Sequence, residues 1–138
     1  VVFSDPSSSY QMLEQMQKIS EDFFKKLGLP YQVVEICSSD LGEKQSKQYD
    51  IEAWYPRQGK YAEVTSASNC TDYQARRLNI RYLAEKNKRE HVHTLNNTMV
   101  ATSRAMVAIL ENYQMRDGSV RVPKILKPYM SVDVINGR

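Results

Sequence analysis

The sequence predicts an α+β domain in which helices flank an antiparallel β-sheet. The evidence is the order of its patterns: a short strand, a long helix, several strands, and a final long helix. Alternating, β-branched and aromatic residues mark the strands, whereas apolar residues at helical spacing mark the helices. Runs of strands bounded by helices are typical of α+β domains with antiparallel sheets.

Composition narrows the class of protein. The chain has 138 residues, 41% of them hydrophobic and 25% charged, which suits one globular domain. A net charge of +3 is too small to argue nucleic-acid binding by itself. No apolar run reaches membrane-spanning length, no signal peptide stands at the start, and Cys37 and Cys70 form no disulfide or zinc pattern. We therefore expect a cytoplasmic protein without a membrane partner; an organellar form is the alternative.

The N-terminal part predicts a strand at residues 1–4 and then a helix that ends at Leu27. Ser8, with Gln11 three residues later, fits a capping box, and Gly28 is a suitable C-terminal stop. Because the chain opens directly on strand-like residues, we expect a fragment of a longer protein.

The middle of the chain predicts an antiparallel sheet. A charged segment at residues 84–90 is expected to be a solvated surface loop. The expected strands cover residues 31–37, 49–55, 60–68 and 78–83, with a helical turn at 72–77.

The last helix, expected from Thr98 to Tyr113, is apolar around nearly its whole circumference, which predicts burial on most sides. Asn96 and Asn97 are good helix starters, and Asn97 would share a face with Arg104 at a separation of about 10 Å. A buried arginine needs an anionic partner. That partner is either a carboxylate in a structural ion pair or a ligand phosphate or carboxylate held by Arg104 and the free N–H groups of the first turn.

Other polar residues within strand patterns allow a metal site. Asp50, Glu52 and Glu63 point either to solvent or to a divalent cation, which prefers oxygen ligands. His91 and His93 are two residues apart and share a face; without a third ligand, a structural role is favoured over a metal pair.

Four segments carry a resemblance to a known family. HTLNNTMVATSRAMVAILENYQ, which starts at His93, resembles the third signature motif of the seryl-tRNA synthetases, a class II family. The similarity continues in YDIEAWYP at 49–56, EVTSASNCTDYQARRLNIRY at 63–82 and DGSVRVPKILKPYM at 117–130. The resemblance implies that residues 1–138 are a C-terminal part of a class II synthetase catalytic domain, whose antiparallel sheet carries the active site.

The resemblance also implies roles for particular residues. Glu63, Val64, Thr65 and Ser66 would line the ATP site, with Glu63 and Ser66 binding magnesium, and the catalytic Arg104 would neutralise the γ-phosphate. Residues three apart on a regular strand face opposite sides. If Glu63 and Ser66 meet one ion, the strand must therefore bulge or end between them.

The serine pocket is implied by the same motif. Asn96 and Thr98 match positions that hold the seryl side chain in the family. Bacterial members generally have glycine where this chain has Asn97 and Met99.

The implied reaction activates serine with ATP and magnesium to seryl-adenylate and then transfers the seryl group to tRNA(Ser) in a homodimeric enzyme. The family's first two motifs would lie upstream of residue 1, so we expect these 138 residues alone to be inactive. The alternatives are a catalytically inactive synthetase-like binding or assembly protein and an amino acid:carrier-protein ligase.

Overall fold

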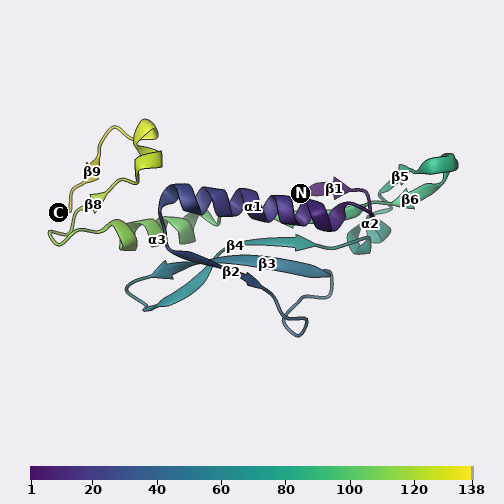
Figure 1. Ribbon diagram of the computed structural model, residues 1–138, viewed down its shortest axis with the longest axis horizontal. Coiled ribbons are helices and arrows are strands. Elements are labelled where there is room, and N and C mark those ends of the chain that lie inside the picture. Colours follow the sequence, from purple (N-terminus) through teal and green to yellow (C-terminus); the bar gives the residue numbers. More distant parts are fainter. Residues whose placement is uncertain (138) are drawn as a thin grey trace.

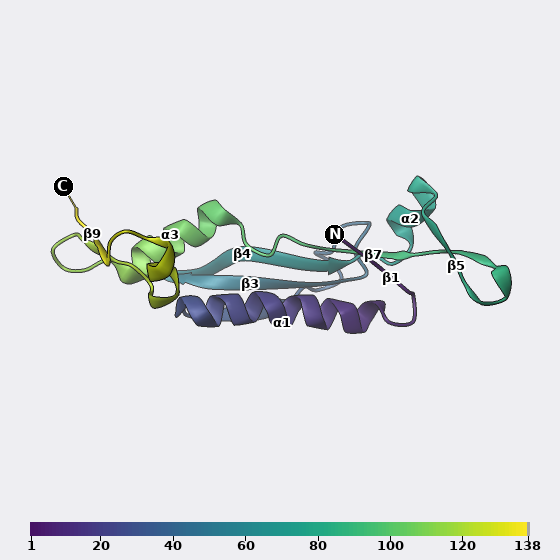
Figure 2. The same cartoon turned by 90° about the horizontal axis from the view of Figure 1, so that it is seen from above.

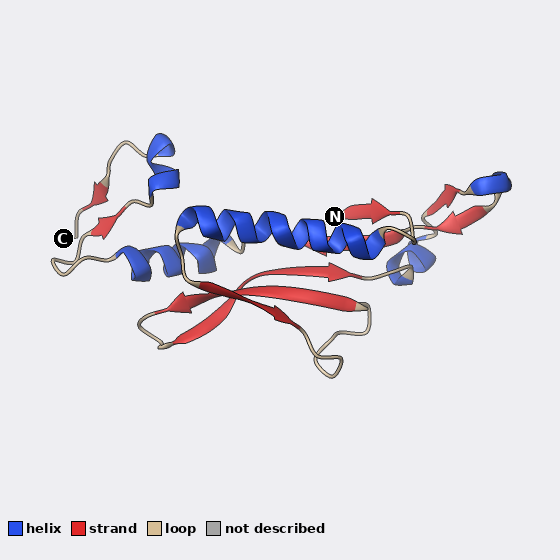
Figure 3. Cartoon of the chain, in the orientation of Figure 1, coloured by secondary structure: helices blue, strands red, loops and turns tan. Residues whose placement is uncertain are grey.

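The computed structural model describes residues 1–137, which form a five-stranded antiparallel sheet with the two longer helices packed on one face (Figure 1, Figure 3). The predicted fold class is confirmed. The strand order is β1-β7-β4-β3-β2, so that β1 and β2 are the two edges. The strands are β1 (Val2–Ser4), β2 (Tyr31–Glu35), β3 (Lys47–Tyr55), β4 (Lys60–Asn69) and β7 (His93–Asn97).

The first helix, α1 (Ser9–Leu27), runs along the sheet, as Figure 2 shows. Its buried stripe faces the strands because Leu13, Met16 and Phe24 recur at helical spacing. The expected capping box is wrong: the Ser8 side chain makes no capping hydrogen bond. Its hydroxyl instead donates to the Asp5 carbonyl oxygen at 3.3 Å, within the preceding turn.

Smaller elements extend from both ends of the sheet (Figure 1). At one end, α2 (Tyr73–Leu78) leads into a two-stranded ribbon of β5 (Arg81–Leu83) and β6 (Arg89–His91), joined through a 3-10 turn, η1 (Glu85–Asn87). The expected surface loop at residues 84–90 is thus partly wrong, because its end forms β6. The remaining elements are β8 (Val120–Arg121), the 3-10 helix η2 (Lys124–Tyr129) and β9 (Val134–Ile135).

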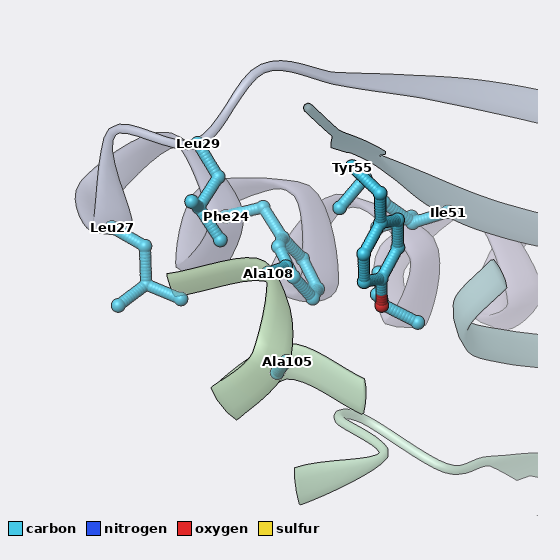
Figure 4. Close-up of a cluster of buried hydrophobic side chains, with 9 residues drawn as sticks. Phe24, Leu27, Leu29, Ile51, Tyr55, Ala105 and Ala108 are labelled. Carbon is cyan, nitrogen blue, oxygen red and sulfur yellow. The ribbon is translucent and has the colours of Figure 1, made fainter. Parts of the chain in front are cut away.

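The main core lies where α1 and α3 (Thr102–Tyr113) meet the sheet (Figure 4). Its side chains are almost wholly removed from water, which is the main favourable contribution to folding. They are Phe24, Leu27, Leu29, Ile51, Ala53, Tyr55, Val64, Ala105 and Ala108. Among the helices of residues 1–137, none is both long and apolar enough to cross a membrane.

The start of α3 differs from the prediction. The helix begins at Thr102 and not at Thr98, because the intervening segment remains extended beside β4. The Thr98 N–H donates to the Ser66 carbonyl oxygen at 3.0 Å, and the Ala101 N–H donates to the Val64 carbonyl oxygen at 2.8 Å. This segment therefore satisfies β4 backbone groups beyond the end of β7.

Two local features keep the helix from starting earlier. Asn97 ends β7 with its side chain turned toward α1, where its amide donates to Ser20 Oγ at 2.8 Å. Met99 has a φ of 59°, in the left-handed region that favours glycine. Asn97 and Arg104 consequently do not share a helix face.

The expected burial of this helix on most sides is also wrong. Only Ala105 and Ala108 are buried. Met106 is 58% exposed, and Val107 and Leu110 are exposed as well, because the sheet and α1 cover a single face of α3.

Candidate active site

A β-bulge in β4 determines which side chains reach the open face of the sheet. In the β3–β4 pair, Glu63 lies opposite Glu52 and Thr65 lies opposite Ile51, so Val64 is an extra residue on β4. An extra residue shifts the alternation of side chains by one position. The bulge that the sequence required between Glu63 and Ser66 is therefore present.

The bulge brings Glu63 and Ser66 to the same face. Ser66 lies opposite Asp50, and Asp50 is two residues from Glu52, so these two acids share a face. Since directly opposite residues on paired strands also share a face, Glu63 and Ser66 join them. This is the face away from α1 and α3.

The other two residues expected at the ATP site turn inward. Val64 is fully buried in the core, and Thr65 is 2% exposed, with its hydroxyl donating to Asn97 Oδ1 at 3.1 Å. Of the four expected residues, only Glu63 and Ser66 present side chains to the open face.

Arg104 lies in the first turn of α3 and is not buried in hydrocarbon: its side chain is 53% exposed. Its Nη1 lies 2.9 Å from Glu63 Oε2 and 3.4 Å from the Glu63 carbonyl oxygen. The anionic partner expected from the sequence is thus the Glu63 carboxylate. Beside the pair is an open hollow of about 520 Å³ lined by Tyr55, Gln58, Ala62, Glu63, Ser103, Arg104 and Val107.

The position of Arg104 favours anions. The first turn of a helix has free N–H groups and the positive end of the helix dipole. A guanidinium in that turn adds to the positive potential, and no side chain caps the turn. The combination of free N–H groups and a guanidinium, expected at Asn97, occurs instead at Thr102–Arg104. The signal for it was the Thr-Ser pair directly before Arg104.

Carboxylates crowd the open face beside this positive site. Burial raises the pKa of Asp50 above its ordinary value, and the nearby charges of Glu63 and Glu52 raise it further. Hydrogen bonds from Gln48 and Ser66 oppose the rise, with Gln48 Nε2 2.9 Å from Asp50 Oδ1. This negative charge favours a bound cation.

The oxygen donors fit magnesium in one particular way. Within residues 1–137, no three Asp, Glu, His or Cys side chains gather closely enough to hold a metal ion by themselves. Magnesium characteristically takes one or two protein ligands and completes its shell with water and substrate phosphates. The Glu63 carboxylate and the Ser66 hydroxyl, on one face of the sheet, could supply such a set.

The two residues expected at the serine pocket adjoin Ser66. Asn96 lies opposite Ser68 and therefore on the open face, and its Nδ2 is 3.6 Å from Cys70 Sγ. Thr98 is exposed and bonded through its backbone N–H to Ser66. The contact between Asn96 and Cys70 was not predicted from the sequence, because it depends on how β4 pairs with β7.

A family profile for the tRNA synthetase class II core domain (G, H, P, S and T) matches residues 1–113. The chain belongs to this class II synthetase family. The shared fold and the open sheet face are therefore those of a class II core.

Known relatives of this class II core are serine–tRNA ligases. That of Caldanaerobacter subterraneus subsp. tengcongensis is 55% identical over 136 residues, which is 98% of this chain and 32% of the relative. The Pyrococcus horikoshii enzyme is 55% identical over 129 residues, 93% of this chain and 28% of the relative. The chain thus spans about a third of the length of these relatives. Neither of the two alternatives considered above finds support among them.

Two solved structures are similar to this chain over 99% of its length. The seryl-tRNA synthetase from Pyrococcus horikoshii complexed with ATP has a TM-score of 0.95 and 53% identity, and the chain covers 31% of it. The cytoplasmic serine–tRNA ligase from Naegleria fowleri in complex with AMP has a TM-score of 0.91 and 41% identity, with 33% covered.

The two histidines have structural partners within this class II core. His93 Nδ1 lies 2.7 Å from the buried Ser9 hydroxyl, and His91 Nδ1 lies 3.3 Å from the Ile80 carbonyl oxygen. Burial lowers the pKa of His93, while Asp72 and Asp5 oppose that shift. The structural role favoured from sequence fits these contacts.

Proposed function

We propose that this chain forms the part of a seryl-tRNA synthetase active site that holds ATP, magnesium and serine. The observation that carries the proposal is the bulge at Val64, which places Glu63 and Ser66 on one open face beside Arg104. The structural similarity to an ATP-bound seryl-tRNA synthetase supports the same assignment.

In the proposed first step, a serine carboxylate oxygen attacks the α-phosphorus of ATP. A bond forms between that oxygen and phosphorus, the bond to the bridging oxygen breaks, and pyrophosphate leaves with the electron pair. Negative charge on the phosphates must be neutralised throughout. Arg104 would exchange part of its contact with Glu63 for a γ-phosphate oxygen, because a guanidinium can serve two anions at once.

Glu63 and Ser66 would hold magnesium on the open face, where the ion neutralises phosphate charge when bound. The residues themselves contribute position: β4 is an interior strand paired with both β3 and β7, so their backbone is fixed. Fixed groups that need no rearrangement during reaction stabilise a transition state better than mobile ones.

Asn96 and Thr98 would recognise serine. A small polar side chain needs donors and acceptors at hydrogen-bond distance, and an amide and a hydroxyl supply both. The 3.6 Å contact with Cys70 Sγ limits the rotation of the Asn96 amide. Discrimination against amino acids without a hydroxyl would follow, because the pocket's polar groups would then be left unpaired.

In the whole protein we propose that residues 1–138 belong to the C-terminal part of the catalytic domain. The seryl group of the adenylate would then pass to tRNA(Ser). The proposed enzyme works as a cytoplasmic homodimer.

A chimera tests this proposal. Residues 1–138 replace the homologous segment of the Pyrococcus horikoshii enzyme, which shares 53% identity and the same fold over this region. The chimera is expected to catalyse ATP–pyrophosphate exchange with serine and not with threonine or glycine. The matched control carries Glu63→Gln, Ser66→Ala and Arg104→Gln in the same chimera and is expected to be inactive. A folded chimera without serine-dependent exchange would overturn the proposal.

A further inference from the structure

The net charge of the chain is concentrated in one segment. Residues 72–91 contain six arginine or lysine residues and three aspartate or glutamate residues, so they account for the whole net charge of +3. The rest of the chain is electrically balanced. This segment comprises α2 and the β5–β6 ribbon, which projects beyond the sheet (Figure 1, Figure 2).

Strand pairing separates the charges of the ribbon onto two faces. Arg81 lies opposite His91, and Leu83 lies opposite Arg89, so these four side chains share one face. Tyr82 and its partner Glu90 occupy the other face. The expectation of a merely solvated loop at 84–90 could not include this separation, because it arises only when Arg89 and Glu90 enter a strand.

Two of the three acidic side chains of this segment already have partners. Glu90 accepts a hydrogen bond from Tyr82 at 3.4 Å and lies 2.9 Å from Lys88 Nζ. Asp72 pairs with Arg76 at 3.4 Å.

The basic face is left without a counter-charge. Across residues 1–137, no carboxylate oxygen lies within 4.0 Å of the side-chain nitrogens of Arg81 or Arg89, and both residues are exposed. A polar hollow of about 430 Å³ adjoins the two arginines and is lined by Asn79, Arg81, Tyr82, Leu83 and Arg89. Leu83, between them on this face, is 65% exposed.

Arg77 on the neighbouring helix α2 is held in place by contacts with Tyr73. The Arg77 guanidinium lies 3.5 Å from the centre of the Tyr73 ring, and its Nη1 donates to the Tyr73 carbonyl oxygen at 3.2 Å. Stacking of this kind restricts an exposed arginine and leaves its remaining donors free. The sequence alone suggested no role for it.

We propose that the ribbon face formed by Arg81, Leu83 and Arg89 binds the sugar–phosphate backbone of the tRNA substrate near its 3′ end. Guanidinium groups match phosphate oxygens, and most contacts that position a nucleic acid go to phosphate and sugar. The exposed leucine offers an apolar surface to a sugar or base. The partner's identity as tRNA rests on the proposed function.

The location of the ribbon supports this partner. β6 continues through Val92 into β7, which carries Asn96 of the proposed serine pocket. The Cys70 N–H donates to the Thr94 carbonyl oxygen at 2.9 Å, so the end of β4, which leads into α2, is bonded to β7. An RNA end that must reach the serine pocket would therefore pass the base of the ribbon.

The test is binding of the 138-residue chain to a fluorescein-labelled RNA stem-loop with a single-stranded 3′ end, followed by fluorescence anisotropy across a salt series. The Arg81→Gln/Arg89→Gln variant is expected to bind at least about tenfold more weakly, with the slope of log Kd against log salt smaller by about 2. Arg81→Lys/Arg89→Lys should keep most of the slope, because it keeps the charge. The charge-matched control is Lys18→Gln/Lys26→Gln on the exposed side of α1, which should leave binding within about twofold.

Three results would overturn the proposal: absence of salt-dependent RNA binding, equal weakening in the ribbon and α1 variants, or equally tight binding of polyglutamate, which would indicate an acidic protein partner. Circular dichroism confirms that each variant is folded. Serine-dependent ATP–pyrophosphate exchange needs no RNA, so the two experiments fail independently. The chimera can be inactive while the ribbon still binds RNA, and the ribbon can fail to bind RNA while the chimera is active.

Discussion

Arg104 of α3 and Glu63 of β4 form an ion pair, with Nη1 2.9 Å from Oε2. The two side chains are 53% and 44% exposed, and a solvent-exposed pair of this kind contributes only about 0–1 kcal/mol to stability. The pair therefore costs little to open. A triphosphate with its magnesium would offer each side chain a partner of opposite charge.

Arg104→Ala in the full-length synthetase is expected to slow adenylate formation roughly a hundredfold, which corresponds to about 3 kcal/mol for one preorganised charge contact. The free energy of unfolding should change by less than about 1 kcal/mol. Serine-dependent exchange and urea unfolding measure the two effects. Arg57→Ala, in the exposed β3–β4 turn, is the control and should change neither. Normal exchange in Arg104→Ala would mean that the ion pair is structural.

Glu63→Gln keeps the shape of the side chain and removes its charge. The magnesium concentration that gives half-maximal exchange is expected to rise at least about tenfold, the loss that even an outer-shell partner of a metal can cause. Glu52→Gln is the matched control: it lies directly opposite on the same face, where its carboxylate accepts a hydrogen bond from Gln32 at 2.6 Å. Identical magnesium titrations for Glu63→Gln and the parent would remove Glu63 from the metal site.

His93 should make stability depend on pH. Ser9 Oγ accepts from Asn69 Nδ2 at 3.2 Å and lies 2.7 Å from His93 Nδ1. Burial lowers the pKa of His93 below 6.5, so the unfolded chain takes up this proton first as pH falls. The stability that the neutral ring contributes is present above pH 6.5 and is lost as pH falls through the folded-state pKa.

Urea unfolding between pH 7.5 and pH 5 measures this effect. The loss of stability on acidification is expected to be smaller in His93→Gln than in the parent chain. His91→Gln is the control and should keep the parent's pH dependence. A His93→Gln curve parallel to that of the parent would show that the ring titrates normally.

The free edge of β1 is expected to drive self-association of the chain. Phe3 is 58% exposed on this edge strand, and unpaired edge strands can pair with the edge strand of another chain. Phe3→Lys should therefore lower the sedimentation coefficient at high protein concentration. Ile19→Lys on α1 removes an equally exposed apolar side chain, also 58%, without touching a sheet edge. Equal effects of the two substitutions would indicate unspecific apolar contact and not edge pairing.

The 138-residue chain alone is expected to show no serine-dependent exchange. Its Arg104, Glu63 and Ser66 would contact a nucleotide from one side, and groups that act as a unit contribute little when part of the unit is missing. Radioactive pyrophosphate exchange on the purified chain measures this. Robust activity would show that residues 1–138 suffice for adenylate formation.

Local patterns in the sequence predicted α1 and strands β1 to β4, because each depends on the spacing of neighbouring residues. Of the strand expected at residues 78–83, only Arg81–Leu83 is a strand, because Leu78 still belongs to α2. The patterns also predicted an anionic partner for Arg104, which Glu63 supplies, although the burial from which that partner was inferred is absent. They failed at the start of α3, where Thr98 and Ala101 bond to β4, a partner distant in sequence. They failed again on the exposure of Met106, because apolar composition does not reveal which faces the rest of the chain covers.

The extra residue at Val64 determines which β4 side chains point toward the core and which point toward the open face. Val64 has no partner on β3, and it sets which face of the sheet the β4 side chains on either side of it occupy. Losing that residue would not thin the core locally; it would exchange inside for outside along half of the strand, sending Ser66 toward α1 and Ala67 toward water. Length variation in this family is therefore expected to spare β4 and to gather instead in the turn at residues 56–59 and the loop at 36–46, where an added residue inverts nothing.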